Sequence, residues 1–221
     1  MSRSRNHLRT LAAAAMAAAG LAWPAVAMGQ SVSGSATAVQ ASVPGMMTTA
    51  LADTGALTDA GDIREASEMT AAIPSLGSAD VLHAATGSSI TDWSAPDYVA
   101  SEASLADTGL TVAGNFISAA FVMARALAAV GESPVGTSEV DGLSINGVPV
   151  DVTGQPNQTV WLLGGKVILN EQIPTSTGTT VNAVHVIVGG VADVVLASAS
   201  AGVSPGGAAV APPIVPVPPL F

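Results

Sequence analysis

The chain has 221 residues, a formal net charge of −10 and no cysteine. The lack of cysteine excludes disulfides, thiolate nucleophiles and cysteine-ligated zinc or iron–sulfur clusters. Charged residues make up 10% of the chain and aromatic residues 3%, while alanine, glycine, serine, threonine and valine are abundant. Small residues of this kind are typical of closely stacked β-sheets, whose stability must come from burial and sheet hydrogen bonding.

Residues 1–27 have the three parts of a secretory signal peptide. Arg3, Arg5 and Arg9 form a basic start, and the apolar run over 11–21 is too short to span a membrane. The sequence Ala-Val-Ala at 25–27 matches a small-residue cleavage motif. We therefore expect the chain to be exported, and its mature form to be secreted or held at the cell surface.

The chain after residue 27 is strongly acidic. It keeps three basic residues, Arg64, Arg125 and Lys166, against sixteen acidic ones, which gives a formal charge of −13. Such a surface repels nucleic acid and anionic lipid headgroups, so neither is expected as a direct partner. No run of eighteen apolar residues follows residue 27, and no transmembrane segment is predicted.

Residues 49–130 look like a duplicated unit of 53 to 54 residues, since Leu-Ala-Asp-Thr-Gly occurs at 51–55 and again at 105–109. A pair of Asp-Thr-Gly motifs also occurs in aspartic proteases, whose two aspartates share a proton. The spacing argues against a protease, because each aspartate of a two-lobed protease lies on its own, much longer lobe. Asp-Thr-Gly is ordinary turn chemistry as well, so we interpret Asp53 and Asp107 as turn residues.

The secondary structure of residues 49–130 is ambiguous from sequence. The alanine-rich stretch around 117–129 allows a helix, whereas the repeat pattern suggests strands. In the first copy Asp59, Asp62, Glu65 and Glu68 recur at every third position, and a helix would stack these like charges on one side. Strands are therefore favoured in both copies. Residues 28–48 form either an initial strand or a disordered leader.

Residues 140–203 read as a series of hairpins. Asn146-Gly147 between two apolar stretches is typical of a type I′ turn, and Gly164-Gly165 marks a second turn or bulge. Gly189-Gly190 separates two further β-branched runs, and such short connections favour antiparallel pairing. Residues 204–221 are proline-rich and end Pro-Pro-Ile-Val-Pro-Val-Pro-Pro-Leu-Phe, which predicts an extended tail.

Residues 140–202 resemble the choice-of-anchor P family of exported bacterial proteins, and residues 31–130 resemble it more weakly. The resemblance implies a single β-rich domain over 28–203 that is displayed at the cell envelope and has no established enzymatic activity. No Leu-Pro-x-Thr-Gly sortase site is present in 204–221, so a covalent anchor is not expected. The segments that carry the resemblance are Gly142–Val150, Pro156–Val160, Val167–Gln172, Val181–Val186 and Ala192–Ala199.

Four polar residues in this region are the candidate binding site: Asn170, Glu171, Asn182 and His185. If their strands pair as a hairpin, Asn170 comes close to Asn182, with Glu171 and His185 at either end of the patch. The alternatives are a structural role, in which the polar groups satisfy one another, and acid–base catalysis by Glu171 and His185. The structural role is favoured. No catalytic residue, metal site or cofactor is predicted.

Taken together, the sequence predicts an all-β protein with sandwich-like antiparallel sheets, and a β-solenoid built on the duplicated unit is the alternative. The predicted function is a non-catalytic structural or adhesive role at the bacterial surface or in an extracellular matrix, with cell-envelope or matrix components as partners. A glycan- or ligand-binding module, with Trp93, Tyr98 and Trp161 as a stacking platform, is the alternative. A carboxylate-dependent hydrolase is a third, weaker alternative.

Overall fold

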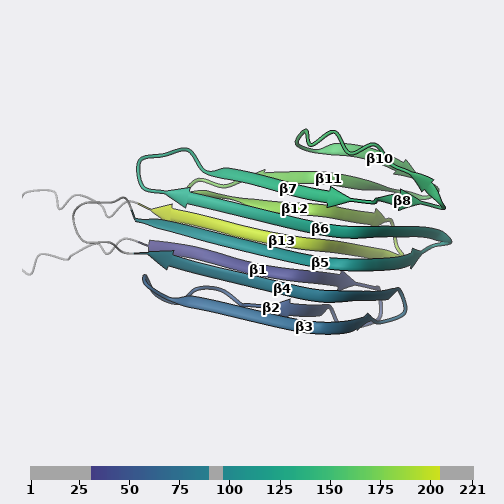
Figure 1. The fold of residues 1–221 in the computed structure, drawn as a ribbon, viewed down its shortest axis with the longest axis horizontal. Helices are drawn as coiled ribbons and strands as arrows, with labels where there is room; N and C mark the ends of the chain where they lie inside the picture. Colours follow the sequence, from purple (N-terminus) through teal and green to yellow (C-terminus); the bar gives the residue numbers. More distant parts are fainter. Residues whose placement is uncertain (1–30, 90–96, 205–221) are drawn as a thin grey trace, which may run out of the picture. The chain divides into compact units, whose positions relative to one another are not determined.

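The computed structural model describes residues 31–89 and 97–204, which all belong to one compact unit over 28–208 (Figure 1). These residues form thirteen strands in two sheets, and every pairing between them is antiparallel. In spatial order, sheet A contains β10 (Gln158–Leu162), β11 (Gly165–Pro174), β12 (Gly178–Val188), β13 (Ala192–Ser204), β1 (Ser31–Ser42) and β2 (Thr49–Asp53).

Sheet B has seven strands, and six of them follow one another across the sheet. These are β3 (Ile63–Ile73), β4 (Gly77–Ser89), β5 (Tyr98–Val112), β6 (Asn115–Ala129), β8 (Ser144–Ile145) and β9 (Val148–Pro149), while β7 (Val135–Asp141) also pairs with β6. Strands β12 and β13 pack against β6, and β1 packs against β4 and β5. The predicted antiparallel sandwich is confirmed, and the solenoid alternative is wrong for the described residues.

The core between the sheets consists of small and branched aliphatic side chains, and it contains none of the described aromatic residues. Alanine and valine dominate, with leucine and isoleucine as the largest members. The sheets approach closely where glycine faces the core. A Cβ atom on Gly34 would lie 2.6 Å from Thr86 Oγ1, and one on Gly136 would lie 2.3 Å from Val181 Cγ2. The small-residue composition therefore permits the short distance between sheets.

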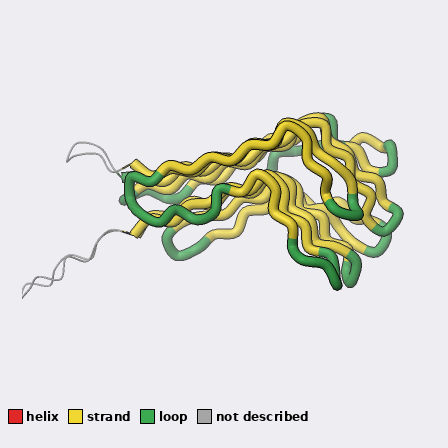
Figure 2. The backbone as a smooth tube through the Cα atoms, turned by 90° about the horizontal axis from the view of Figure 1, so that it is seen from below, coloured by secondary structure: helices red, strands yellow, loops and turns green. Residues whose placement is uncertain are grey.

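All the long strands bend at the same level, as the backbone in Figure 2 shows. At the bend the buried positions shift by one residue. In β13, Val194 and Leu196 face the core before the bend, and Ala197, Ala199 and Ala201 face it after the bend. The same shift occurs in β1, β5, β6 and β12. Because neighbouring strands shift together, their pairing resumes in register beyond the bend. Left-handed backbone at the bend occurs at Ala52, Val81, Asp107, Asn170 and Ala197.

The hairpin predictions for the last third of the chain are confirmed. Asn146 and Gly147 have φ values of 53° and 78°, as a type I′ turn requires, and they join β8 to β9. Gly164 lies in the turn between β10 and β11, and Gly189-Gly190 lies between β12 and β13. The stretch at 117–129 lies within β6, so the strand prediction is correct and the helix alternative is wrong. Strand β1 likewise replaces the disordered-leader alternative over 31–42.

The two Asp-Thr-Gly copies lie in unlike places. Asp53 ends β2 at the edge of sheet A, and its Oδ1 accepts a hydrogen bond from the Gly55 amide at 3.1 Å, so the turn prediction is confirmed there. Asp107 lies in the middle of β5 in sheet B, at the bend, so the turn prediction is wrong for the second copy. Tertiary pairing decides the second case, because β5 continues through the motif between β4 and β6.

Candidate functional site

Three of the four predicted site residues meet on the outer face of sheet A. Glu171 on β11 is the direct cross-strand partner of Asn182 on β12, and Asn182 is the partner of Ser198 on β13. Asn182 Nδ2 donates to Glu171 Oε2 at 2.7 Å, and Ser198 Oγ donates to Asn182 Oδ1 at 2.7 Å. The side chains thus form a chain of hydrogen bonds across three strands.

His185 extends this series of hydrogen bonds. Its Nδ1 lies 2.7 Å from Glu171 Oε2, and its Nε2 lies 2.9 Å from Asp193 Oδ1 on β13. The side chains of His185 and Glu171 are only 15% and 16% exposed, whereas that of Asp193 is 56% exposed. Both imidazole nitrogens therefore lie within hydrogen-bond distance of carboxylates of the same polypeptide.

Asn170 lies next to the cross-strand partner of Asn182, but its side chain does not join this group. It lies at the bend with a φ of 50°, and its Nδ2 donates to the Gly154 carbonyl at 2.9 Å. Its Oδ1 accepts from Gln172 Nε2, which also donates to the Gly136 carbonyl in sheet B at 2.9 Å. The bend places Asn170 and Glu171 in different surroundings, so Asn170 serves the link between sheets.

The carboxylates of the two Asp-Thr-Gly motifs have separate surroundings. Asp53 Oδ1 accepts from Thr37 Oγ1 at 2.9 Å as well as from the Gly55 amide, while Asp107 is exposed on β5 of the other sheet. Within residues 31–89 and 97–204, no group of three or more His, Asp or Glu side chains has the geometry to hold a metal ion. In the same residues, no helix is long and apolar enough to cross a membrane.

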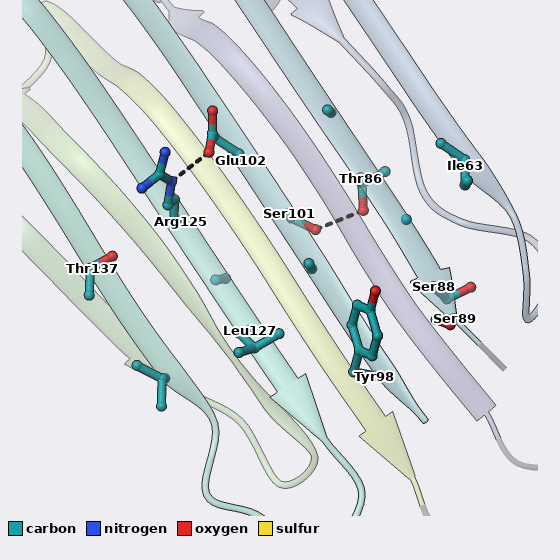
Figure 3. A pocket seen from close by; sticks show the side chains of 15 residues that line it. Ile63, Thr86, Ser88, Ser89, Tyr98, Ser101, Glu102, Arg125, Leu127 and Thr137 are labelled. Atoms are coloured by element: carbon teal, nitrogen blue, oxygen red, sulfur yellow. Dashed lines mark hydrogen bonds and ion pairs between the residues drawn. The ribbon is translucent and has the colours of Figure 1, made fainter. Parts of the chain in front are cut away.

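A groove on the outer face of sheet B has a volume of about 770 Å³ (Figure 3). Its floor is formed by Ala85 and Gly87 of β4 and Ala100 of β5. Four exposed side chains rise around that floor, with exposed fractions of 79% for Ile63, 42% for Tyr98, 43% for Leu127 and 55% for Val135. They form a contiguous apolar surface open to solvent.

The strand register explains why this groove exists. Ile63, Gly87, Ala100, Leu127 and Val135 are successive cross-strand partners on β3 to β7. Large side chains stand at both flanks of this row and the smallest ones stand in the middle, so the face is hollowed along β4 and β5. The charged pair Glu102–Arg125 lies further along the same strands, as Figure 3 shows. That pair is partly exposed and neutralises itself, which leaves the groove apolar.

The floor is fixed from beneath by a hydrogen bond between the sheets and by a second one that joins β4 to β5. Ser101 Oγ donates to the Ser200 carbonyl of β13 at 2.7 Å, and Thr86 Oγ1 lies 2.7 Å from Ser101 Oγ. A hydroxyl has one hydrogen, so Thr86 is the donor in its contact with Ser101. Both hydroxyls are buried. The strands under the groove are thus bonded to sheet A at this end of the sandwich.

An ion pair orders the loop beside the groove. Asp62 Oδ2 accepts from Arg64 Nε at 2.9 Å and from the Thr58 amide at 3.2 Å. The hydrogen bond from Arg64, followed by that from Thr58, lowers the pKa of the Asp62 carboxyl below its ordinary value of 3.8. The Asp62 carbonyl accepts from the Ser88 amide at 3.0 Å, which ties this loop to the end of β4.

Sequence reasoning found the polar chain of sheet A and missed the groove of sheet B, apart from Tyr98. Trp161 is 78% exposed on β10 at the edge of sheet A, so it does not join Tyr98 in an aromatic platform. Trp93 lies outside the described residues. The signal for the groove was the presence of outward-facing Gly87 and Ala100 between large apolar residues. This pattern can be recognised only when the strand register is known.

The chain was compared with protein-family models, with curated proteins and with solved structures, and no match was found in any of the three.

Proposed function

We propose that this chain is a non-catalytic module of a bacterial surface or extracellular matrix, and that it acts by packing or adhesion through the groove on the outer face of sheet B. The observation that carries this proposal is the apolar groove itself, with Ile63, Leu127 and Val135 exposed around a floor of small residues. Contiguous apolar surface of this kind costs solubility and is characteristic of interaction sites.

The polar clusters support a non-catalytic role. Glu171 and both nitrogens of His185 are used in hydrogen bonds within sheet A. The aspartates of the Asp-Thr-Gly motifs belong to different sheets, which is unfavourable for a shared proton. These arrangements favour binding over acid–base chemistry.

The location rests on the sequence. The predicted signal peptide at 1–27 favours export, and the resemblance to the choice-of-anchor P family favours display at the cell envelope. Residues 1–27 lie outside the described residues, so cleavage near Met28 remains a prediction. N-terminal sequencing of the exported protein tests it, and a mature chain that begins at Met1 would overturn it.

One observation favours glycan binding as a second candidate function. Tyr98 lines the groove together with Ser89 and Thr137, and aromatic rings beside hydroxyls and a charged pair are suited to sugar rings. In this alternative the tyrosine ring stacks on the sugar and the Glu102–Arg125 pair binds its hydroxyls.

The test blocks the groove without disturbing the fold. Gly87 has ordinary backbone geometry, and a Cβ there would meet its nearest neighbour, Ile63 Cγ1, at 3.4 Å. Gly87→Val should therefore fold normally and fill the floor. Gly109→Val is the matched control, because Gly109 lies on β5 outside the groove and its Cβ would contact only the Phe116 ring, at 3.6 Å.

Binding of labelled protein to the envelope and matrix fractions of the producing cells is then measured. We expect Gly87→Val to lose binding and Gly109→Val to keep it. Equal binding by both variants would contradict the groove as the adhesive site. Competition by soluble glycans from the same fractions would favour the glycan alternative, whereas loss of binding after protease treatment of the fractions would favour a protein partner.

A further inference from the structure

The groove has the width of one extended polypeptide chain. Ile63 and Leu127 flank it on β3 and β6, with β4 and β5 between them. Neighbouring strands lie about 4.8 Å apart, so the flanking strands are separated by roughly 14 Å. Side chains of Ile63 and Leu127 narrow this space further. A single extended chain fits such a slot, whereas a second sheet is too wide for it.

The floor dictates what kind of chain can lie there. β4 and β5 are interior strands, paired on both sides, so their backbone amides and carbonyls already bond each other. An occupant gains no backbone hydrogen bonds from the floor, unlike a peptide that adds to a sheet edge. The best-suited occupant is one that needs few such bonds. A proline-rich chain meets this condition, because proline has no amide hydrogen and polyproline II has no internal hydrogen bonds.

The side chains around the floor agree with this choice. The Tyr98 ring and the aliphatic side chains of Ile63, Leu127 and Val135 offer the aromatic and apolar contacts that proline-rich segments use. Glu102 and Arg125 pair with each other, so no net charge is left to attract a charged peptide. The groove is therefore matched to an uncharged, proline-rich segment.

This chain contains such a segment. Residues 205–221 have no charged side chain and include Pro-Pro-Ile-Val-Pro-Val-Pro-Pro-Leu-Phe. The groove runs from Tyr98 to Glu102 along β5, about 13 Å at the usual strand rise, which roughly four residues of a polyproline II chain would span. The segment is thus long enough to fill the groove.

We propose that the groove binds residues 205–221 of a second copy of this chain. The inference rests on the proposed function, since it names the partner for the same groove. The two surfaces in such a contact are unlike, so the contact is head-to-tail and continues from copy to copy when the rotation does not close. A repeating contact of this kind would build a surface layer or matrix from a single protein.

The test uses Tyr98 as a reporter, because it is the only tyrosine in the chain. The chain from residue 28 to 221 is labelled with 3-fluorotyrosine, and its single fluorine resonance is followed by NMR over a dilution series. We expect the resonance to move with protein concentration, and sedimentation velocity to show oligomers that dissociate on dilution. A second chain, in which the five prolines between 212 and 219 are replaced by alanine, should stay monomeric with a fixed resonance.

A synthetic peptide of residues 208–221 is then added to the alanine-substituted chain. We expect a saturable shift of the resonance. The same peptide with its prolines replaced by alanine should bind at least tenfold more weakly. When Gly87→Val is introduced into the alanine-substituted chain, the peptide should cause no saturable shift. When Gly109→Val is introduced into the alanine-substituted chain, the peptide should bind as it does to that chain with Gly109 in place. Equal binding of the two peptides, or no shift with either, overturns the proposal. A resonance that differs between the two chains but is independent of concentration overturns the assignment to a second copy.

The adhesion assay separates this inference from the proposed function. The fractions for this comparison come from cells that do not produce this chain, because the intact groove of the alanine-substituted chain would otherwise bind residues 205–221 of resident copies. If the alanine-substituted chain binds these fractions as well as the original while Gly87→Val does not, the groove is adhesive and its partner is another molecule. That outcome overturns the inference alone. If Gly87→Val also binds normally, the proposed function falls as well.

Discussion

On the outer face of sheet A, the polar side chains around His185 bond one another, whereas on the outer face of sheet B the apolar side chains around Gly87 and Ala100 face solvent. The first face contains residues that attract notice as chemistry: a histidine, two carboxylates and an amide. Their bonding capacity is directed at each other across β11, β12 and β13. The second face contains residues of little chemical character, and its apolar area is left exposed.

This difference shows why reactive residue types alone are a weak guide to a site. A polar group inside or near a sheet must find partners, and neighbouring strands supply them. An exposed apolar groove has no such partners within the protein, so its surface is removed from water only when another molecule binds. Substitutions in sheet A should therefore change stability, and substitutions in the groove should change binding.

Asn182→Ala should lower the free energy of unfolding by about 2 to 3 kcal/mol, because it leaves Glu171 and Ser198 without their partner in a largely buried place. Glu171→Gln keeps an acceptor for Asn182 and should cost less, about 1 kcal/mol. Chemical denaturation of both variants measures these losses. Adhesion by the folded fraction should be unchanged. A normal stability combined with lost adhesion would make this face functional and reverse the comparison.

Asp107→Val should cost about 1 to 2 kcal/mol, because a β-branched residue is strained at the φ of 42° that the bend imposes on this position. Asp107→Gly should be nearly neutral, since glycine adopts that conformation freely. The bend lies under both outer faces, so this loss of stability belongs to the fold as a whole and not to the surface of either sheet. Thermal unfolding of the two variants gives the answer, and equal melting temperatures would show that the bend can relax.

Arg64→Gln should lower the melting temperature slightly at neutral pH, because it removes the main partner of Asp62 beside the groove. The folded-state pKa of Asp62 is lowered below 3.8, so its contribution to stability is present above about pH 4 and is lost as the pH falls through the folded-state pKa. The difference in melting temperature between the original chain and the variant should therefore shrink in acid. A difference that grows below pH 4 would contradict this assignment of the ion pair.

Much of the fold was predictable because local chemistry and tertiary structure agree. Asn146-Gly147 takes the backbone that its type I′ turn requires, and the glycine-bounded runs after residue 157 become hairpins. The stretch at 117–129 was harder to assign, because the bend shifts its buried positions from odd to even numbers. A period of two is interrupted in mid-strand, and a short alanine-rich segment with an interrupted period can pass for a helix.

The site was less predictable, and the reason is register. From sequence, Asn170 and Asn182 looked like direct partners, but the register of β11 and β12, which is the same on both sides of residue 170, makes Glu171 the cross-strand partner of Asn182. The groove depends on four strands being aligned so that Gly87 and Ala100 lie between Ile63 and Leu127. No local pattern contains that alignment, since it is decided by pairings between residues far apart in the chain.

Leu127→Ser should have the smallest effect on folding and a large one on binding. Its side chain is 43% exposed at the groove flank, so little apolar area is lost from the folded core and the change in stability should stay within about 0.5 kcal/mol. Adhesion should fall because serine removes one wall of the apolar slot. Paired measurement of unfolding and of binding to envelope and matrix fractions is the check, with Gly109→Val as the control. Stability lost in proportion to adhesion would mean that the flank supports the fold, and the division between the two faces would then fail.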